Sequence, residues 1–265
     1  MELDDSAERD LGVCCGDFYN HPIVSALLGG IFHPGGLALS KLMADKMGVD
    51  SESKVLDIAC GEGKTATYLA RSLGCTVTGI DANQAMIESA IQIAEDLRVS
   101  ERTDFTLALA GKIPYEDNSF TAAISECSLC TFYDKNQAVK EITRVLKPGG
   151  VFGLNDVTVR NHEDLDEELR GLLGRVACVA DALSVDEYIH LFESEGFKLL
   201  ASSNHSDLLE DLARKAKGRA RFFREVAVDD DTIDKMTDAI RIIGLIENQI
   251  ETENIGYEMF IFKSV

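Results

Sequence analysis

Short apolar runs alternate through the middle of the chain with longer stretches whose apolar residues recur at helical spacing. The first run, at 55–59, is followed by such a stretch at Ala66, Leu69 and Ala70, which predicts a strand, a turn and a helix. The same criteria predict strands at 75–80, 103–108, 120–125, 150–155 and 197–201, and helices at 83–96, 135–146, 165–173 and 185–194. Strands that alternate with helices of this length indicate a doubly wound α/β fold, with a parallel sheet covered on both faces.

The C-terminal part adds two helices and one more strand to this pattern. Helical stretches at 207–226 and 232–252 precede a β-rich run at 257–262. A strand there, antiparallel to the strand at 197–201, would complete a mostly parallel sheet of seven strands. The two helices would then be an insertion before the last strand, available for homodimer contacts or as a wall of the substrate site.

The N-terminal part contains two further helical patterns, at 23–28 and 37–47, separated by a glycine-rich segment around His33. We interpret them as a helical lid over a pocket, with a simple packing extension as the alternative. The predicted organisation is an N-terminal helical lid segment at 1–48, an α/β core at 49–205, a helical insertion at 206–254 and a last strand at 255–265.

Composition and charge narrow the class of protein. With 265 residues, 45% of them hydrophobic and 27% charged, the chain fits one large domain or one domain with appendages. No stretch approaches the roughly 20 apolar residues of a membrane span, and the first residues are acidic, unlike a signal peptide. We therefore expect a cytoplasmic protein without a membrane partner. A formal net charge of −20 repels phosphate backbones, so nucleic acid is not expected as a partner.

The turn after the first strand has the composition of a ligand-binding loop. Gly61 and Gly63 lack Cβ atoms where a ligand would press against the main chain, and the N–H groups that open the next helix offer hydrogen bonds. A dinucleotide fingerprint would have its third glycine where this chain has Ala66, so the loop leaves the nucleotide open. Asp81, about 20 residues further on, suits a pair of ribose hydroxyls. For the glycine loop, the alternative is a turn that only reverses the chain. For Asp81, the alternative is an acid at a helix N-terminus, stabilised by the helix dipole.

The cysteines are better interpreted as thiols than as a disulfide framework. There are seven of them, an odd number, and the chain has no secretory signal. Cys60 and Cys75 suit small apolar core positions. Cys127 and Cys130 form a Cys-x-x-Cys pair with no second pair or histidine at the spacing of a zinc site, so no resident metal is expected.

Five motifs in order resemble the class I methyltransferases that use S-adenosylmethionine. They are Val55-Leu-Asp-Ile-Ala-Cys-Gly-Glu-Gly63, Val77-Thr-Gly-Ile-Asp81, Ile113-Pro-Tyr-Glu-Asp-Asn-Ser-Phe120, the strand from Phe120 to Glu126, and Arg144-Val-Leu-Lys-Pro-Gly-Gly150. The resemblance covers roughly residues 50 to 200 and implies a Rossmann-like core. It also implies that S-adenosyl-L-methionine is the cofactor and that its binding residues are Asp57, Ala59, Gly61, Gly63, Asp81, Ala82, Met86, Leu109, Ala110 and Glu126. One departure is Ala108-Leu109-Ala110, where the family commonly has an acid that contacts adenine.

The cysteines give a finer resemblance, to arsenite methyltransferases. The passages around Cys127 and Cys130 and after Cys178 are similar to those of that subfamily, although Asp181 replaces a usual glycine. The resemblance implies catalytic roles for Cys127, Cys130, Cys178 and Glu126, and arsenic bound as thiolates by Cys14, Cys15, Cys127 and Cys178.

Two other functions remain open on the residues alone. The acceptor could be a small organic molecule while the cysteines only pack, with Glu126, His33, Tyr19 or Tyr133 as a base or orienting group. Alternatively, the chain could be a non-catalytic, cofactor-binding partner subunit that assembles through its C-terminal helices.

Overall fold

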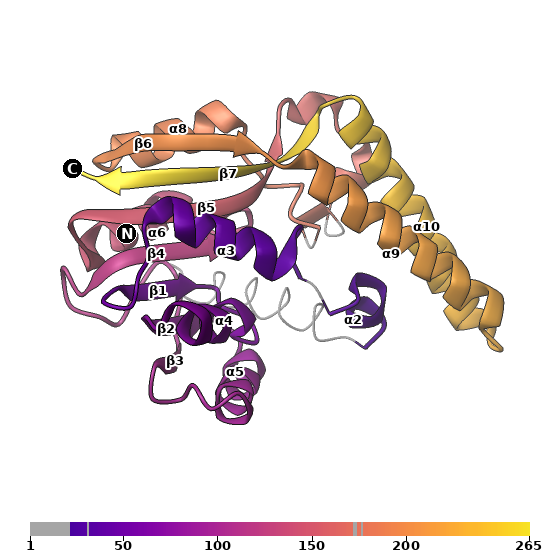
Figure 1. Cartoon of the computed structure of the whole chain (residues 1–265). Coiled ribbons are helices and arrows are strands. Elements are labelled where there is room, and N and C mark those ends of the chain that lie inside the picture. The colour runs from indigo at the N-terminus through magenta and orange to yellow at the C-terminus, as the bar shows by residue number, and fades with distance from the viewer. Residues whose placement is uncertain (1–21, 31, 172–173, 176) are drawn as a thin grey trace.

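A computed structural model of the chain describes residues 22–30, 32–171, 174–175 and 177–265 (Figure 1). Cys14, Cys15 and Tyr19, for which the sequence suggested chemical roles, lie outside these ranges.

The described residues form one sheet of seven strands, which confirms the predicted fold class. Its spatial order is β3-β2-β1-β4-β5-β7-β6. Only β7 runs antiparallel to its neighbours among these strands, and it lies between β5 and β6. The strands are β1 (Lys54–Ile58), β2 (Thr76–Asp81), β3 (Thr103–Leu107), β4 (Phe120–Glu126), β5 (Leu146–Val159), β6 (Phe197–Asn204) and β7 (Ile255–Ser264).

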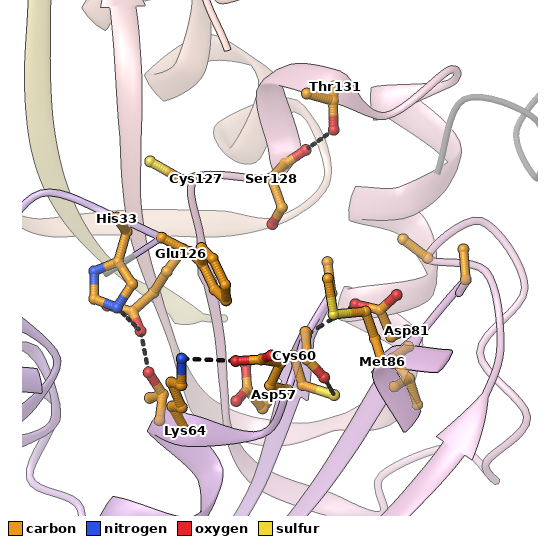
Figure 2. A pocket seen from close by; sticks show the side chains of 18 of the residues that line it. His33, Asp57, Cys60, Lys64, Asp81, Met86, Glu126, Cys127, Ser128 and Thr131 are labelled. Atoms are coloured by element: carbon orange, nitrogen blue, oxygen red, sulfur yellow. Dashed lines mark hydrogen bonds and ion pairs between the residues drawn. The ribbon is translucent and has the colours of Figure 1, made fainter. Parts of the chain in front are cut away.

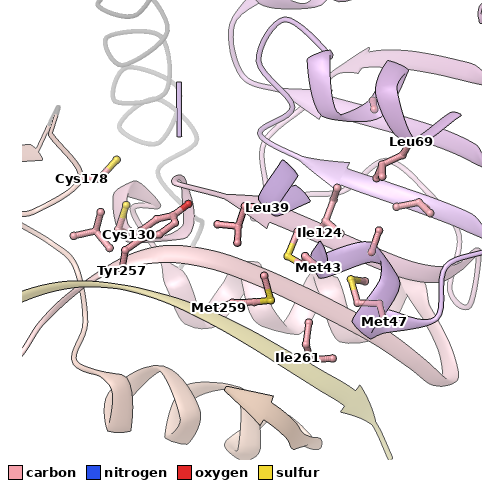
Figure 3. Packing of buried hydrophobic residues seen from close by; sticks show 14 of the residues in the cluster. Leu39, Met43, Met47, Leu69, Ile124, Cys130, Cys178, Tyr257, Met259 and Ile261 are labelled. Atoms are coloured by element: carbon pink, nitrogen blue, oxygen red, sulfur yellow. The ribbon is translucent and has the colours of Figure 1, made fainter. Parts of the chain in front are cut away.

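Helices cover both faces of the sheet, as Figure 1 shows. One face carries α3 (Gly36–Met47), α4 (Lys64–Leu73) and α5 (Gln84–Asp96), whose buried residues share a core with β1, β4 and β7 (Figure 3). The other face carries α6 (Lys135–Val145) and α8 (Val185–Ser194). The remaining helical elements are α2 (Pro22–Leu28), the 3₁₀ turns η1 (Leu129–Thr131), η2 (His162–Asp164) and η3 (Glu167–Arg170), and α9 (Ser206–Val226) and α10 (Asp230–Glu251).

Strand β7 explains why the C-terminal run is apolar at nearly every position. Tyr257, Met259 and Ile261 belong to the core under α3 and α4. Phe260 and Phe262 belong to the core under α6 and α8. Because successive side chains of a strand point to opposite faces, a strand in the interior of a covered sheet must be apolar on both.

Two expectations for the segment between β4 and β6 differ from the structure. Strand β5 begins at Leu146 rather than at 150, and it runs to Val159 because β7 pairs with its whole second half. The helix expected at 165–173 is wrong: the described part of that segment contains only the turn η3. Leu165 and Leu169 are both buried, but only Leu169 lies in η3 and Leu165 follows η2, so both side chains reach the core without a helix.

Helices α9 and α10 pack along each other and extend away from the sheet (Figure 1). Helix α2 lies against α9, where Leu27 joins Ala220 and Met236 in a separate small core. Arg219 also donates a hydrogen bond to the Leu27 carbonyl at 2.9 Å. Within the described ranges, none of the helices is both long and apolar enough to cross a membrane.

Candidate active site

A cavity of about 300 Å³ lies at the carboxyl ends of β1, β2 and β4 (Figure 2). In doubly wound sheets this edge is where ligands bind. Of the residues predicted to bind cofactor, those that line the cavity are Asp57, Ala59, Gly61, Asp81, Ala82, Met86, Leu109, Ala110 and Glu126. Gly63 is not among them.

The two loop glycines have different tasks. Both have positive φ, 53° at Gly61 and 68° at Gly63. A Cβ atom at Gly61 would meet nothing within 4 Å, since it would point into open space. A Cβ atom at Gly63 would lie 2.8 Å from the Cβ of Ala90 and from the ring of Phe105. Gly63 therefore permits α4 to begin against α5 and β3, while Gly61 keeps space free for a ligand.

Asp81 organises this loop from the end of β2. Its Oδ2 atom accepts the N–H of Gly61 at 2.9 Å, and its Oδ1 atom accepts the N–H of Asn83 at 2.9 Å. Burial raises the pKa of Asp81, while these hydrogen bonds oppose the shift. The carboxylate thus connects the glycine loop to the start of α5 and still borders the cavity.

Asp57 has an acceptor atom without a partner. Its side chain is only 3% exposed, and it accepts the backbone N–H of Ala66 at the start of α4. Its Oδ2 atom has no hydrogen-bond partner within the described part of the chain. Burial, and then the negative charges of Glu126 and Asp81, raise the pKa of Asp57 well above its usual range. A buried acceptor in this state fits a cationic donor such as the ammonium group of S-adenosylmethionine.

Glu126 is held at the end of β4 by three neutral donors. Ser40 Oγ lies 3.0 Å from both carboxylate oxygens, Thr65 Oγ1 donates at 2.8 Å and Asn155 Nδ2 at 2.9 Å. The Nε2 atom of His33 lies 3.7 Å from Oε2 of Glu126 (Figure 2). This brings the N-terminal segment, α3, α4 and β5 together around one carboxylate.

The three cysteines meet at the far end of the cavity, but they do not share the same surroundings. Cys127 and Cys178 line the cavity, whereas Cys130 does not and is 1% exposed; Figure 3 shows Cys130 near Cys178 and Tyr257 in the core. The Cys178 thiol donates to the Cys127 carbonyl at 3.3 Å, and Cys127 lies 3.6 Å from the Tyr257 hydroxyl. Both Cys127 and Cys178 have positive φ, 50° and 62°. Among the residues described, no group of three or more His, Cys, Asp or Glu side chains is arranged to hold a metal ion.

The environment of Cys127 and Cys130 favours the protonated form of both thiols. A hydrogen bond with Cys178, and then burial, raise the pKa of Cys127 well above its usual range, while burial is the main cause of the same shift for Cys130. Burial and the neighbouring Cys178 also raise the pKa of Asp156 to about 7. Since thiolates rather than thiols react with disulfide reagents, we predict slow labelling of the native protein.

This prediction is checked by counting thiols with a chromogenic disulfide reagent at pH 7. Cys127 and Cys130 should react at least about 100-fold more slowly in the native protein than in guanidinium chloride. The variants Cys127→Ser and Cys130→Ser show which part of the labelling reaction belongs to which cysteine. Rapid labelling of Cys127 without denaturant would contradict the assigned environment.

Several cavity residues were not anticipated from the sequence. Phe32, Leu37 and Phe132 supply apolar surface, and Lys64 and Thr65 supply polar groups. Lys64 lies 4.5 Å from the Phe32 ring centroid and donates to the Gly30 carbonyl at 3.0 Å. The sequence signal that could have identified Lys64 and Thr65 is the position of these polar residues directly after the glycine loop. Of the residues suggested as a base, His33 lines the cavity, whereas Tyr133 is 60% exposed and does not.

Comparison with known proteins identifies the central part of the chain. Residues 56–154 match the family model described as a methyltransferase domain (Methyltransf_11). Methyltransferase GfsG of Streptomyces halstedii is 31% identical over 175 residues, which are 65% of this chain and 62% of that protein. Sterol 24-C-methyltransferase erg6 of Aspergillus fumigatus is 32% identical over 169 residues, 62% of this chain and 45% of that protein. The matched region thus spans less than two thirds of either relative's length.

A solved structure shares the fold over nearly the whole chain. The [4+2]-cyclase SpnF superposes with a TM-score of 0.80 at 23% identity and covers 97% of this chain and 96% of its own. Neither the two relatives nor this structural neighbour points to the arsenite methyltransferase-like subfamily, which stays a prediction. The family match, the order of the strands and the unpartnered carboxylate oxygen in the cavity agree with one another: residues 56–154 match a methyltransferase domain, and the chain is similar to methyltransferases over about two thirds of its length.

Proposed function

We propose that the protein transfers the methyl group of S-adenosylmethionine to a small organic acceptor. The observation that carries the proposal is the cavity itself, whose lining combines acidic groups with apolar walls. Asp57 and Asp81 supply the acidic groups, and Phe32 and Phe132 supply apolar surface. A buried, apolar acceptor site next to a cationic methyl donor suits methyl transfer, because the reacting groups are aligned and water is excluded.

The cofactor-binding roles belong to this proposal. Asp81 would accept from the ribose hydroxyls, and Asp57 and Glu126 would face the positively charged end of the cofactor. Leu109 and Ala110, both 8% exposed, would contact adenine through apolar atoms. The main-chain groups of Ala59, Gly61 and Ala82 would approach the cofactor closely, Met86 would pack against it from α5, and Gly63 would support the loop from behind.

The relatives favour an organic acceptor. Their names include a sterol methyltransferase and a glycine/sarcosine/dimethylglycine N-methyltransferase. These names describe those proteins, whose substrates differ widely in size and polarity. The modest volume of the cavity here, about 300 Å³, favours an acceptor that is small or enters only in part.

A second candidate acceptor is arsenite, bound through Cys127 and Cys178. The contact of these two cysteines inside the cavity favours it, with Cys130 behind them and Cys14 and Cys15 as the further predicted ligands. The raised pKa of the Cys127 thiol weighs against it, because trivalent arsenic is held by thiolates. A homodimer formed through α9 and α10 and a cytoplasmic location are further parts of the proposal; sedimentation analysis tests the first and fractionation the second.

Calorimetry and product analysis test the proposed function. We expect S-adenosylmethionine to bind in the micromolar range, and S-adenosylhomocysteine to accumulate with at least one acceptor from catechol, glycine, dimethyl sulfide and arsenite. Loss of two or three titratable thiols on adding arsenite would support the metalloid acceptor, and no loss would exclude it. Absence of cofactor binding at millimolar concentration would overturn the proposal.

The same experiment separates the non-catalytic alternative. If the cofactor binds but none of the four acceptors yields S-adenosylhomocysteine, the chain is better described as a cofactor-binding subunit or as an enzyme of another kind. The structural neighbour SpnF is a [4+2]-cyclase, so the fold alone does not decide between these functions.

A further inference from the structure

His33 occupies an unusual position for a histidine of an N-terminal segment. Its side chain is 14% exposed and lines the cavity beside Phe32, Gly36 and Leu37. It comes just before α3, whose residue Ser40 donates to Glu126. The ring is therefore placed at the end of β4, beside the Glu126 carboxylate in the cavity.

The hydrogen bonds of the ring indicate which nitrogen is basic. The Nδ1 atom lies 3.4 Å from the carbonyl oxygen of Pro34. A carbonyl oxygen only accepts hydrogen bonds, so this contact favours the tautomer with the proton on Nδ1. In the neutral ring Nε2 is then unprotonated, and it is Nε2 that lies 3.7 Å from the Glu126 carboxylate.

Two acceptor atoms therefore approach each other across a short gap in the cavity. An unprotonated Nε2 and a carboxylate oxygen repel each other unless a proton or a donor group lies between or beside them. Glu126 cannot turn away, because Ser40, Thr65 and Asn155 already hold it. This pair of atoms is thus suited to a group that brings an O–H or N–H bond.

We propose that His33 is the base of the reaction and that the acceptor carries a hydroxyl or N–H group, a proposal that rests on the function proposed above. The acceptor's X–H bond breaks as its proton passes to Nε2 of His33. The electron pair left on the acceptor forms the bond to the methyl carbon, and the carbon–sulfur bond breaks with its pair remaining on sulfur. The imidazolium so formed faces the Glu126 carboxylate, which stabilises its charge. Its proton then passes to solvent.

Other charged and titratable groups line the same cavity. They are Asp57, Cys60, Glu62, Lys64, Asp81, Cys127 and Cys178. Lys64 is engaged with Glu62, the Gly30 carbonyl and the Phe32 ring. The Cys178 thiol donates to the Cys127 carbonyl. Asp81 accepts the N–H of Gly61, and Asp57 accepts the N–H of Ala66. Among the charged side chains of the described residues, it is the Glu126 carboxylate that lies within 4 Å of the His33 ring.

The first test needs no acceptor. In the full-length protein labelled with ¹⁵N-histidine, the NMR pattern of the neutral His33 ring should be that of the Nδ1–H tautomer. The variant His33→Gln assigns the signal. A neutral ring that is protonated at Nε2 instead would overturn the proposal, because that nitrogen could not then accept a proton.

The second test uses turnover of catechol and glycine, which lose a proton on methylation, and of dimethyl sulfide, which does not. With catechol or glycine, His33→Gln should lower kcat by about 100-fold and remove the fall in rate on acidification. Affinity for S-adenosylhomocysteine should stay within about threefold. Added imidazole should restore part of the activity of His33→Ala. The matched control is His190→Gln, an exposed histidine on α8.

Each outcome of the second test is decisive. Unchanged kcat in His33→Gln, or turnover of dimethyl sulfide alone, would overturn the role of His33 while leaving methyl transfer intact. A loss of S-adenosylhomocysteine affinity above tenfold would mean that His33 serves the cofactor instead of the acceptor, which also overturns it. A wild-type protein that binds cofactor and methylates none of these compounds would overturn the proposed function, and the role of His33 with it.

Discussion

Replacing Asp57 with asparagine is expected to weaken binding of S-adenosylmethionine by about 100-fold and, at the same time, to make the cofactor-free protein more stable. Asparagine keeps one oxygen, which the N–H of Ala66 already uses. The amide nitrogen would then take the place of the unpartnered Oδ2. A donor would thus face the ammonium of the cofactor where an anionic acceptor is needed. Hydrogen bonds to charged groups contribute about 1.5–3 kcal/mol, and each 1.4 kcal/mol corresponds to about a tenfold change in affinity.

The gain in stability follows from the charge that asparagine lacks. Burial and the neighbouring Glu126 and Asp81 raise the pKa of Asp57 above its ordinary value of 3.8. As pH rises, the Asp57 carboxyl group therefore loses its proton at a lower pH in the unfolded chain than in the folded protein. The free energy of unfolding falls across the pH range between the unfolded and the folded pKa of Asp57. An asparagine side chain at this position has no proton to lose. The stability difference between variant and wild type should consequently grow with pH, to about 1 to 3 kcal/mol.

Urea unfolding at pH 5 and pH 8, together with calorimetry of cofactor binding, checks both parts of the expectation. The control is Asp45→Asn, because the Asp45 side chain is 52% exposed and paired with Lys41 on the surface; it should change stability by less than about 0.5 kcal/mol. Equal stability of Asp57→Asn and wild type at pH 8, or unchanged cofactor affinity, would contradict the assigned role of the carboxylate.

Replacing Gly63 with alanine should have the largest effect on stability, a loss of about 2 to 5 kcal/mol. The backbone there has φ 68°, a left-handed conformation that costs a non-glycine residue about 1–2 kcal/mol. In addition, the new Cβ would lie 2.8 Å from Ala90 and the Phe105 ring, and overpacking of this kind typically costs about 1–3 kcal/mol. Neither neighbour is the free end of a flexible side chain, so α4 would have to shift.

Two glycine variants serve as comparisons in the same thermal and urea unfolding experiments. Gly61→Ala places its Cβ in open space, so it should lose about 1 to 2 kcal/mol from backbone strain alone while impairing cofactor binding strongly. Gly218→Ala, in α9 with no atom near its Cβ position, should stabilise the protein by about 1 kcal/mol. If Gly63→Ala proved no less stable than Gly61→Ala, packing behind the loop could not be the reason for glycine there.

The sequence predicted the α/β core well because its signals are local. Each strand and helix of the core buries an apolar face within its own length, so periodicity locates it to within a few residues. The helix expected at 165–173 was wrong for the same physical reason. Two apolar residues four apart, Leu165 and Leu169, fit a helix, but Leu165 follows η2 and Leu169 lies in η3, and only the surrounding packing decides that both are buried in this way.

The candidate site divides in a similar way. Glycines and acids at strand ends, such as Gly61 and Asp81, were predictable because the carboxyl ends of parallel strands necessarily meet at one edge. The partners of Glu126 were not: Ser40 and Asn155 come from α3 and β5, far from it in the chain. The contact between His33 and Glu126 likewise depends on how the N-terminal segment folds back over the sheet.

The sequence by itself therefore determined the class of fold and the cofactor-type loop, because both follow from residues that are neighbours in the chain or lie at equivalent strand ends. The tertiary structure alone decided which acids have partners, that the Cys127 and Cys130 thiols stay protonated, and that His33 faces the carboxylate of Glu126. Hydrogen bonding, burial and charge proximity are properties of the packed molecule, and no spacing along the chain specifies them.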